Sequence, residues 1–161
     1  MERFFACLVV VQSLAACADD AASCPALFDL ALDGARTPAV AFEPDGLPEA
    51  RVRVLIARSQ HEIACGLSTV DGIPADVGML FMLPSTYDWI INTEDNLFPI
   101  DMIFIRSNLT VVSVIAGAEA QSAAPRFATG PSHYLLEVNA GWAAANGVVA
   151  DMPLRFDGFS P

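Results

Sequence analysis

Residues 78–105 read GMLFMLPSTYDWIINTEDNLFPIDMIFI and carry the strongest structural signal in the chain. Three short apolar runs lie in this stretch, separated by residues 84–86 and by the polar residues 94–96. Short aliphatic and aromatic runs bounded by turn residues are typical of β-strands. In the first and last runs neighbouring residues are both apolar, so both faces of these strands should be covered. We therefore expect this stretch to form the centre of the fold.

Further strands and two short helices are expected on either side. Short apolar or alternating runs predict strands at residues 27–32, 38–42, 51–57, 110–115, 134–138 and 152–156. The Ser-Gln-His-Glu sequence at residues 59–62 has the form of a capping box, so a helix should run to about residue 65 and end at Gly66. A second helix containing residues 142–145 should be capped by Asn139 and end at Gly147.

These elements predict an α+β, β-rich domain, in the form of a small, mostly antiparallel, partly closed barrel with two short helices. Short connections favour antiparallel pairing, and closure removes exposed sheet edges. The chain has 161 residues, of which 54% are hydrophobic, so it can bury the core of one domain. We place a signal peptide at residues 1–16, a tether at 17–26 and a single domain at 27–161.

The N-terminal segment has the layout of a lipoprotein-type signal peptide. Arg3 precedes an unbroken apolar run at residues 4–11, which is too short for an ordinary membrane span. The Leu-Ala-Ala-Cys sequence at residues 14–17 resembles a bacterial lipobox, whose cysteine is lipidated. Lipid on Cys17 would anchor the protein to a membrane of the cell envelope, facing the periplasm. The alternative is ordinary cleavage at the Ala-Cys-Ala sequence of residues 16–18, which would release a soluble periplasmic or secreted protein.

The four cysteines have different expected fates. Cys7 is lost with the signal peptide and Cys17 carries the lipid, which leaves Cys24 and Cys65 in an oxidising compartment. We expect these two to form a disulfide, although sequence alone leaves the distance between them open and two unpaired cysteines are the alternative. His61 lies four residues before Cys65 on the predicted helix, so a thiolate–imidazole pair is a competing interpretation.

Charge and motif content exclude several function classes. The net charge is −11, every cation is arginine and no lysine occurs, so the protein should repel nucleic acid phosphates and have no nucleic acid partner. There are only two histidines and no ligand cluster with zinc-like spacing. Phosphate loops, dinucleotide fingerprints and nucleophile elbows are absent from the sequence. We predict no metal and no cofactor.

Five phrases, in order along the chain, together resemble one family. They are Gly66-Leu67, the Gly-Met-Leu-Phe sequence at 78–81, Trp-Ile-Ile-Asn-Thr at 89–93, Pro-Ile-Asp-Met-Ile-Phe at 99–104 and Leu-Glu-Val-Asn-Ala-Gly-Trp-Ala at 136–143. This pattern is similar to that of the domain of unknown function 192 family, and the likeness covers residues 51–156. The resemblance implies a compact β-rich domain that is often secreted, and it implies no activity.

The chain also departs from the family pattern. Residues 64–68 lack the arginine and methionine that are usual around the glycine, and Ile91 stands where a lysine or arginine is common. Residues 94–96 (Glu-Asp-Asn) resemble an insertion before the Pro-Ile-Asp run. Basic groups that the family could use for an anionic ligand are therefore reduced in this chain.

Asp101 is the most informative polar residue. It begins a predicted strand whose next residues on the same face are Ile103 and Ile105. A carboxylate on an apolar face needs partners or a functional reason. In a structural role, Asp101 would accept backbone N–H bonds or pair with an arginine such as Arg106 or Arg126.

In a functional role, Asp101 would be the polar anchor of a ligand pocket with Asn92, Thr93 and Trp89. Glu137 carries the same ambiguity, with a weaker signal. Two functions follow. The first is a lipid-anchored binding domain of the cell envelope, whose partner is a small ligand or an envelope protein. The alternative is an envelope hydrolase that uses Asp101 or Glu137 as an acid or base.

Overall fold

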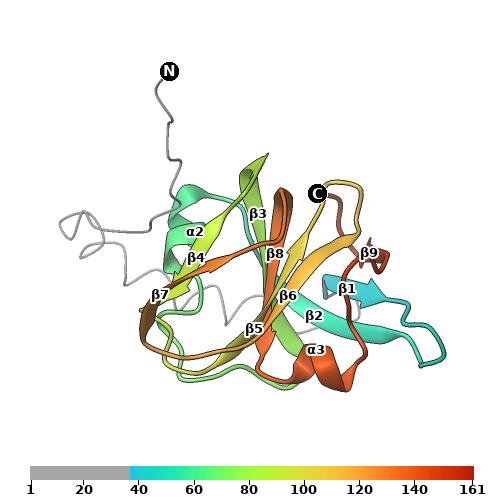
Figure 1. Cartoon of the computed structure of the whole chain (residues 1–161), viewed down its shortest axis with the longest axis horizontal. Helices are drawn as coiled ribbons and strands as arrows, with labels where there is room; N and C mark the ends of the chain where they lie inside the picture. Colours follow the sequence, from blue (N-terminus) through green and yellow to red (C-terminus); the bar gives the residue numbers. More distant parts are fainter. Residues whose placement is uncertain (1–36) are drawn as a thin grey trace.

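Nine strands and two short helices form within residues 37–161, the part of the chain that the computed structural model describes (Figure 1). In chain order they are β1 (Ala39–Phe42), β2 (Ala50–Ala57), α2 (Gln60–Cys65), β3 (Val77–Tyr87), β4 (Ile90–Thr93), β5 (Ile100–Ile105), β6 (Val111–Ala118), β7 (Ser122–Phe127), β8 (Ser132–Asn139), α3 (Trp142–Ala145) and β9 (Leu154–Asp157). The predicted signal peptide, tether and strand at 27–32 lie outside the described residues. Within them the structure confirms a β-rich α+β fold.

Seven strands form one curled sheet in the order β6-β5-β8-β3-β2-β1-β9, and β4 pairs with β7 in a second, small sheet. Every pair is antiparallel except β2 with β3, which run parallel and are joined through α2. The two outermost strands of the large sheet meet at one end, where a bridge joins Thr110 to Pro153. The Leu154 N–H also donates to the Leu109 carbonyl at 3.0 Å. The predicted partly closed, mostly antiparallel barrel is confirmed.

The curled sheet has an apolar cluster on each face. Alternation along β8 sends Leu136 and Val138 into the barrel interior, where they join residues such as Phe42 and Ile103. Leu135 points to the outer face and belongs to a second cluster. Phe81, Phe98, Ile63 and Leu67 belong to this second cluster, so α2 and the segment around β4 help to cover the outer face. No helix within residues 37–161 is long and apolar enough to cross a membrane.

Gly78 allows β3 and β8 to lie close together. It pairs with Val138 across the two strands. A Cβ atom at this position would lie 2.7 Å from the carbonyl oxygen of Glu137 and 2.9 Å from Cγ1 of Val138. Any side chain here would force the strands apart. The glycine of the Gly-Met-Leu-Phe sequence therefore allows the backbone at Glu137 to lie close to β3.

The two helices begin differently. Ser59 and Glu62 form the predicted capping box: Ser59 Oγ accepts from the Glu62 N–H at 3.1 Å, and Glu62 Oε2 accepts from the Ser59 N–H at 2.8 Å. The predicted Asn139 cap of α3 is wrong. Asn139 is the last residue of β8, and its side-chain amide donates to the carbonyls of Ile73 and Pro74. Gly141 occupies the N-cap position of α3 with φ 84°.

Candidate functional site

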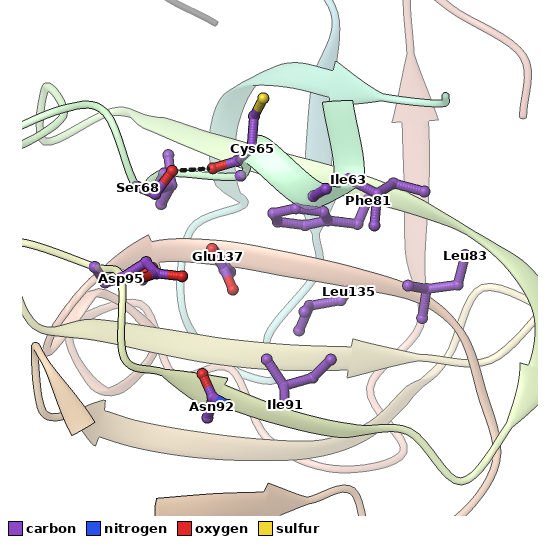
Figure 2. Close-up of a pocket in the computed structure, with 14 residues that line it drawn as sticks. Ile63, Cys65, Ser68, Phe81, Leu83, Ile91, Asn92, Asp95, Leu135 and Glu137 are labelled. Carbon is purple, nitrogen blue, oxygen red and sulfur yellow. Dashed lines mark hydrogen bonds between the residues drawn. The ribbon is translucent and has the colours of Figure 1, made fainter. Parts of the chain in front are cut away.

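A pocket opens on the outer face of the large sheet, between α2 and β4 (Figure 2). Its volume is about 80 Å³. One water needs roughly 10–15 Å³ of such space, so about six waters, or a ligand of similar size, would fit. The residues that line it are Ile63, Ala64, Cys65, Gly66, Leu67, Ser68, Phe81, Leu83, Ile91, Asn92, Asp95, Asn96, Leu135 and Glu137. Apolar walls with a few polar groups are typical of small-ligand sites.

Glu137 is the buried acid of this pocket. Strand register places it between Met79 of β3 and Met102 of β5, both fully buried. Its side chain is 5% exposed and points into the pocket in Figure 2. No hydrogen-bond or ion-pair partner for this carboxyl is found among residues 37–161, and burial raises its pKa to about 8. Burying a carboxyl without a partner is unfavourable, so such groups are candidates for functional sites.

Asn96, in the wall of the pocket, has an unpartnered side-chain nitrogen that is shielded from solvent. Its Nδ2 is buried and has no hydrogen-bond acceptor among the described residues. The backbone around it is well held, because the Asn96 N–H donates to the Thr93 carbonyl at 3.1 Å and the Asn96 carbonyl accepts from the Gln121 N–H at 3.0 Å. Asn96 and Asp95 belong to residues 94–96, the segment that resembles an insertion, and both contribute to one wall of the pocket.

The electrostatic character of the pocket is acidic or neutral. Asp95 is exposed and lines the pocket together with Glu137. The lining residues include no arginine, lysine or histidine within the described part of the chain. Ile91 belongs to the lining, at the position where the family resemblance leads one to expect a cation. The site therefore offers no positive charge to an anion.

Asp101 lies away from this pocket, on the interior face of β5, where it pairs in register with Val138. It is fully buried. Its Oδ1 accepts from the backbone N–H groups of Gly117 at 2.8 Å and Gly141 at 3.0 Å, and its Oδ2 accepts from that of Ala143 at 2.9 Å. Asp101 thus holds the start of α3 against the sheet. These contacts agree with the structural role considered for it, and a role as ligand anchor stays a prediction.

The other three predicted pocket residues are separated from Asp101. Asn92 lines the pocket, and its Oδ1 accepts from the Glu94 N–H at 3.1 Å. Thr93 is fully buried and its hydroxyl donates to the Glu119 carbonyl. Trp89 is 4% exposed, and its indole N–H lies 3.2 Å from the Ser85 and Ser132 carbonyls. The structure therefore brings Asn92 to the pocket with Glu137. The Asn96 amide was not foreseen, although its place in an inserted polar turn beside β4 was a usable signal.

His61 and Cys65 share a face of α2 as predicted. The Cys65 Sγ lies 3.6 Å from Nε2 of His61 and 4.0 Å from Nδ1. In Figure 2 the sulfur points away from the centre of the pocket. Cys24 and Cys17 lie outside the described residues, so the disulfide and the lipid anchor stay predictions. Within residues 37–161, no group of three or more His, Cys, Asp or Glu side chains could hold a metal ion.

A second hollow, of about 350 Å³, lies near residues 43–47 and 147–153. Its acidic side chains, Glu43, Asp45 and Asp151, are exposed, and two of them form ion pairs. Asp151 pairs with Arg106 at 3.0 Å, and Glu43 pairs with Arg155 at 2.8 Å. This hollow lacks a buried polar group in need of a ligand, and the Glu137 pocket is the stronger candidate.

Comparisons with known proteins agree with the resemblance found in the sequence. A structure of a protein from Sinorhizobium meliloti 1021, described as a proposed transcription regulator, is 25% identical, with a TM-score of 0.71 over 79% of this chain and 99% of that one. A protein of unknown function from Novosphingobium aromaticivorans DSM 12444 is also 25% identical, with a TM-score of 0.68 over 73% of this chain and 83% of that one. No curated protein matches the chain. The model of domain of unknown function 192, described as "Uncharacterized ACR", matches residues 41–156, so the chain belongs to this family.

Proposed function

We propose that this domain binds a small ligand in the Glu137 pocket. The observation that carries the proposal is a carboxyl that is 5% exposed, unpartnered among the described residues, and directed into a cavity of about 80 Å³. A buried acid without a partner lowers stability, and a protein that keeps one gains something in exchange. A ligand that hydrogen-bonds to Glu137 would supply the missing partner.

An anionic ligand is disfavoured at this site. Asp95 and Glu137 line the pocket without a cation, and the whole chain carries a net charge of −11. The same charge argues against extending the transcription-regulator description of the Sinorhizobium meliloti protein to DNA binding by this chain. Its arginines include Arg51, Arg53, Arg106 and Arg155, which pair with carboxylates in the structure.

Binding is favoured over hydrolysis. Asp101, one of the two acids considered for a hydrolase, has both carboxylate oxygens engaged by backbone N–H groups. Glu137 could act as an acid, yet a nucleophile with a partner base is needed beside it. Ser68 lines the pocket, and its hydroxyl donates to the Cys65 carbonyl at 2.6 Å. This geometry supports a ligand-binding site more directly than a catalytic one.

We further propose that the domain is held in the bacterial cell envelope by lipid on Cys17, facing the periplasm. The support is the signal-peptide layout of residues 1–16 and the Leu-Ala-Ala-Cys sequence that follows it. Cys17→Ser should abolish the acylated form and leave precursor, or a soluble product cut after Ala18. A Cys17→Ser protein that still partitions into detergent as a mature acylated species would disprove the lipid anchor.

Native mass spectrometry of protein purified from its own host tests the binding proposal. The protein should carry a small molecule that denaturation releases. Ala64→Leu fills part of the pocket from α2 and should reduce the occupied fraction at least fivefold. Ala144→Leu is the matched control, because Ala144 is an exposed alanine on α3, away from the pocket. Equal occupancy in the two variants would place the ligand elsewhere, and a ligand-free parent protein would count against the proposal.

A further inference from the structure

We infer that the Glu137 pocket takes a small organic cation, a primary ammonium on a short apolar chain. The inference rests on the proposed function of the pocket and adds the charge of the ligand to it. Two carboxyl groups line the pocket, the buried one of Glu137 and the exposed one of Asp95. Among residues 37–161 neither has a hydrogen-bond or ion-pair partner, and no lining residue is basic. Both acids would therefore attract a positive charge in the pocket.

The carboxyl of Glu137 can be reached from the pocket. Within the described part of the chain, the unpartnered side-chain atoms that are completely shielded are the Asn96 Nδ2, the Arg126 Nε and the Ser132 Oγ. The oxygens of Glu137 also lack a partner but are not among these atoms, so they keep some accessible surface although the residue is only 5% exposed. Figure 2 shows this carboxyl directed into the space between α2 and β4. A ligand in the pocket therefore contacts Glu137.

A cation in the pocket would change the protonation of Glu137. Without a ligand, burial raises the pKa of Glu137 to about 8, so the carboxyl is mostly protonated at neutral pH. A positive charge nearby favours the ionised form and lowers this pKa. The ammonium then donates to a carboxylate, and such charge-assisted hydrogen bonds are stronger than neutral ones. Binding at neutral pH should therefore release a proton from Glu137.

Few other groups around Glu137 can titrate. Asp95 comes from the turn after β4, and its negative charge adds to the attraction for a cation. Cys65 comes from α2, but its sulfur points away from the centre of the pocket and lies 3.6 Å from Nε2 of His61, which is not a lining residue. The neighbours of Glu137 on β3, β5 and β4 are uncharged; they are Met79, Phe81, Met102, Ile91 and Asn92.

Other ligand classes match these features less well. An anion would meet Asp95 and find no basic group in the lining. A neutral molecule could hydrogen-bond to protonated Glu137, but it gains nothing from Asp95 or from the net charge of −11, which draws cations to the protein. A divalent metal ion needs several oxygen ligands, and within residues 37–161 no group of three or more His, Cys, Asp or Glu side chains could hold one.

The apolar lining fits the chain of such a ligand. Ile63, Leu83 and Leu135 contribute aliphatic walls. Phe81 contributes an aromatic ring, whose face also attracts cations. A chain of about three carbons with its ammonium group stays within a space for about six waters.

NMR titrations of isotopically labelled mature protein at constant ionic strength test the inference. The probes are propylammonium, which stays protonated below about pH 9 as a lysine side chain does, the neutral 1-propanol and the anion propionate. Propylammonium should shift the backbone resonances of Glu137 saturably and bind roughly tenfold more tightly than the other two near pH 8. Its Kd should fall by up to about tenfold per pH unit between about pH 6 and pH 8. The ¹³C resonance of the Glu137 carboxyl should report a lower pKa when the probe is bound.

Two variants separate the contributions of the acids. Glu137→Gln keeps the size of the side chain but cannot ionise, so propylammonium binding should weaken roughly tenfold or more and lose its pH dependence, while 1-propanol binding should change little. Asp95→Asn removes an exposed charge and should weaken propylammonium binding roughly two- to fivefold. Asp45→Asn is the matched control, because Asp45 is an exposed aspartate between β1 and β2, outside the pocket lining. Dispersed amide spectra show whether each variant is folded.

Several outcomes would overturn the cation inference and leave the binding function standing. They are tighter binding of 1-propanol or propionate than of propylammonium, a propylammonium Kd that stays constant between about pH 6 and pH 8, and an anionic or uncharged ligand on the protein from its own host. If propylammonium shifts no pocket resonance, the cation inference fails. If the host protein also carries no ligand, the proposed function fails with it.

Discussion

Replacing Glu137 by glutamine should change how the stability of the protein depends on pH. Burial raises the pKa of Glu137 from its ordinary value of 4.5 to about 8, so the folded state holds this proton more tightly than the unfolded state. Between these two values the folded state binds more protons, and rising pH therefore lowers the free energy of unfolding. The stabilisation is fully present below about pH 4.5, declines through the window and is lost above about pH 8.

The expected size of the effect follows from the same window. Each pH unit within it lowers the free energy of unfolding by about 1.4 kcal/mol, so the full span corresponds to roughly 5 kcal/mol. Solvent that enters the pocket when Glu137 ionises would screen part of the charge, so we expect about 3–4 kcal/mol to remain. For a chain of this size that is roughly 10 °C in Tm. Glu137→Gln removes the titrating group, so its Tm should rise relative to the parent as the pH increases.

Thermal unfolding of the parent and Glu137→Gln proteins, measured in steps from about pH 5 to pH 9, tests whether their difference in Tm grows with pH. Glu62, Asp76 and Asp157 do not interfere, because hydrogen bonds lower their pKa values and their stabilisation is lost only as pH falls below the window. Glu119→Gln makes the same chemical change at an exposed position and should follow the parent. If the Glu137→Gln and parent curves stay parallel between about pH 5 and pH 8, the carboxyl is not desolvated and the reasoning about the pocket is refuted.

Three further predictions concern the scaffold. Asp101→Asn should lower the free energy of unfolding by about 2–3 kcal/mol. The substitution weakens three charge-assisted hydrogen bonds and places an NH₂ against a backbone N–H. An unchanged thermal midpoint would contradict this structural role of Asp101. Gly78→Ala should lower the free energy of unfolding, measured in a denaturant melt, by roughly 1–3 kcal/mol, because its Cβ would lie 2.7 Å from a backbone oxygen. Gly72→Ala is the control: its Cβ would meet no atom within 4 Å, so the loss should be much smaller. Cys24 and Cys65 should not react with a thiol-blocking reagent before reduction, because a disulfide has no free thiol. The bridge would stabilise the domain by about 4 kcal/mol. Quantitative labelling of both cysteines without reductant would exclude the disulfide.

Local patterns predicted the elements whose causes are local. The capping box at residues 59–62 predicted α2 because both of its hydrogen bonds lie within one turn. Period-two alternation likewise predicted β8. The start of α3 was assigned to the wrong residue because its N–H groups are satisfied by Asp101, which is 40 residues away from Gly141 in sequence. A polar side chain nearby in sequence is only one of the partners that a helix start can use.

The pocket could be only partly predicted, because it is formed by residues that are distant from one another in sequence. Glu137 was recognisable as one acid in an apolar strand, but its missing partner depends on how α2 and β4 close over the outer face of the sheet. The unpartnered Asn96 amide depends on the packing of a turn against that face. The parallel pairing of β2 with β3 was also unforeseen: the chain between them is long enough for a crossover through α2.

The pairing of β1 with β9 affects how the chain can fold as it is synthesised. Ala39 lies opposite Asp157 and Phe42 opposite Leu154, so one edge of the large sheet joins the start of the described chain to its end. The nascent chain cannot complete this sheet until the last strand has left the ribosome, and contacts so distant in sequence form slowly. A polypeptide threaded across a membrane by a secretion channel must stay unfolded until it arrives. Delayed completion of the sheet by β9 would therefore be compatible with the export that we propose for this chain.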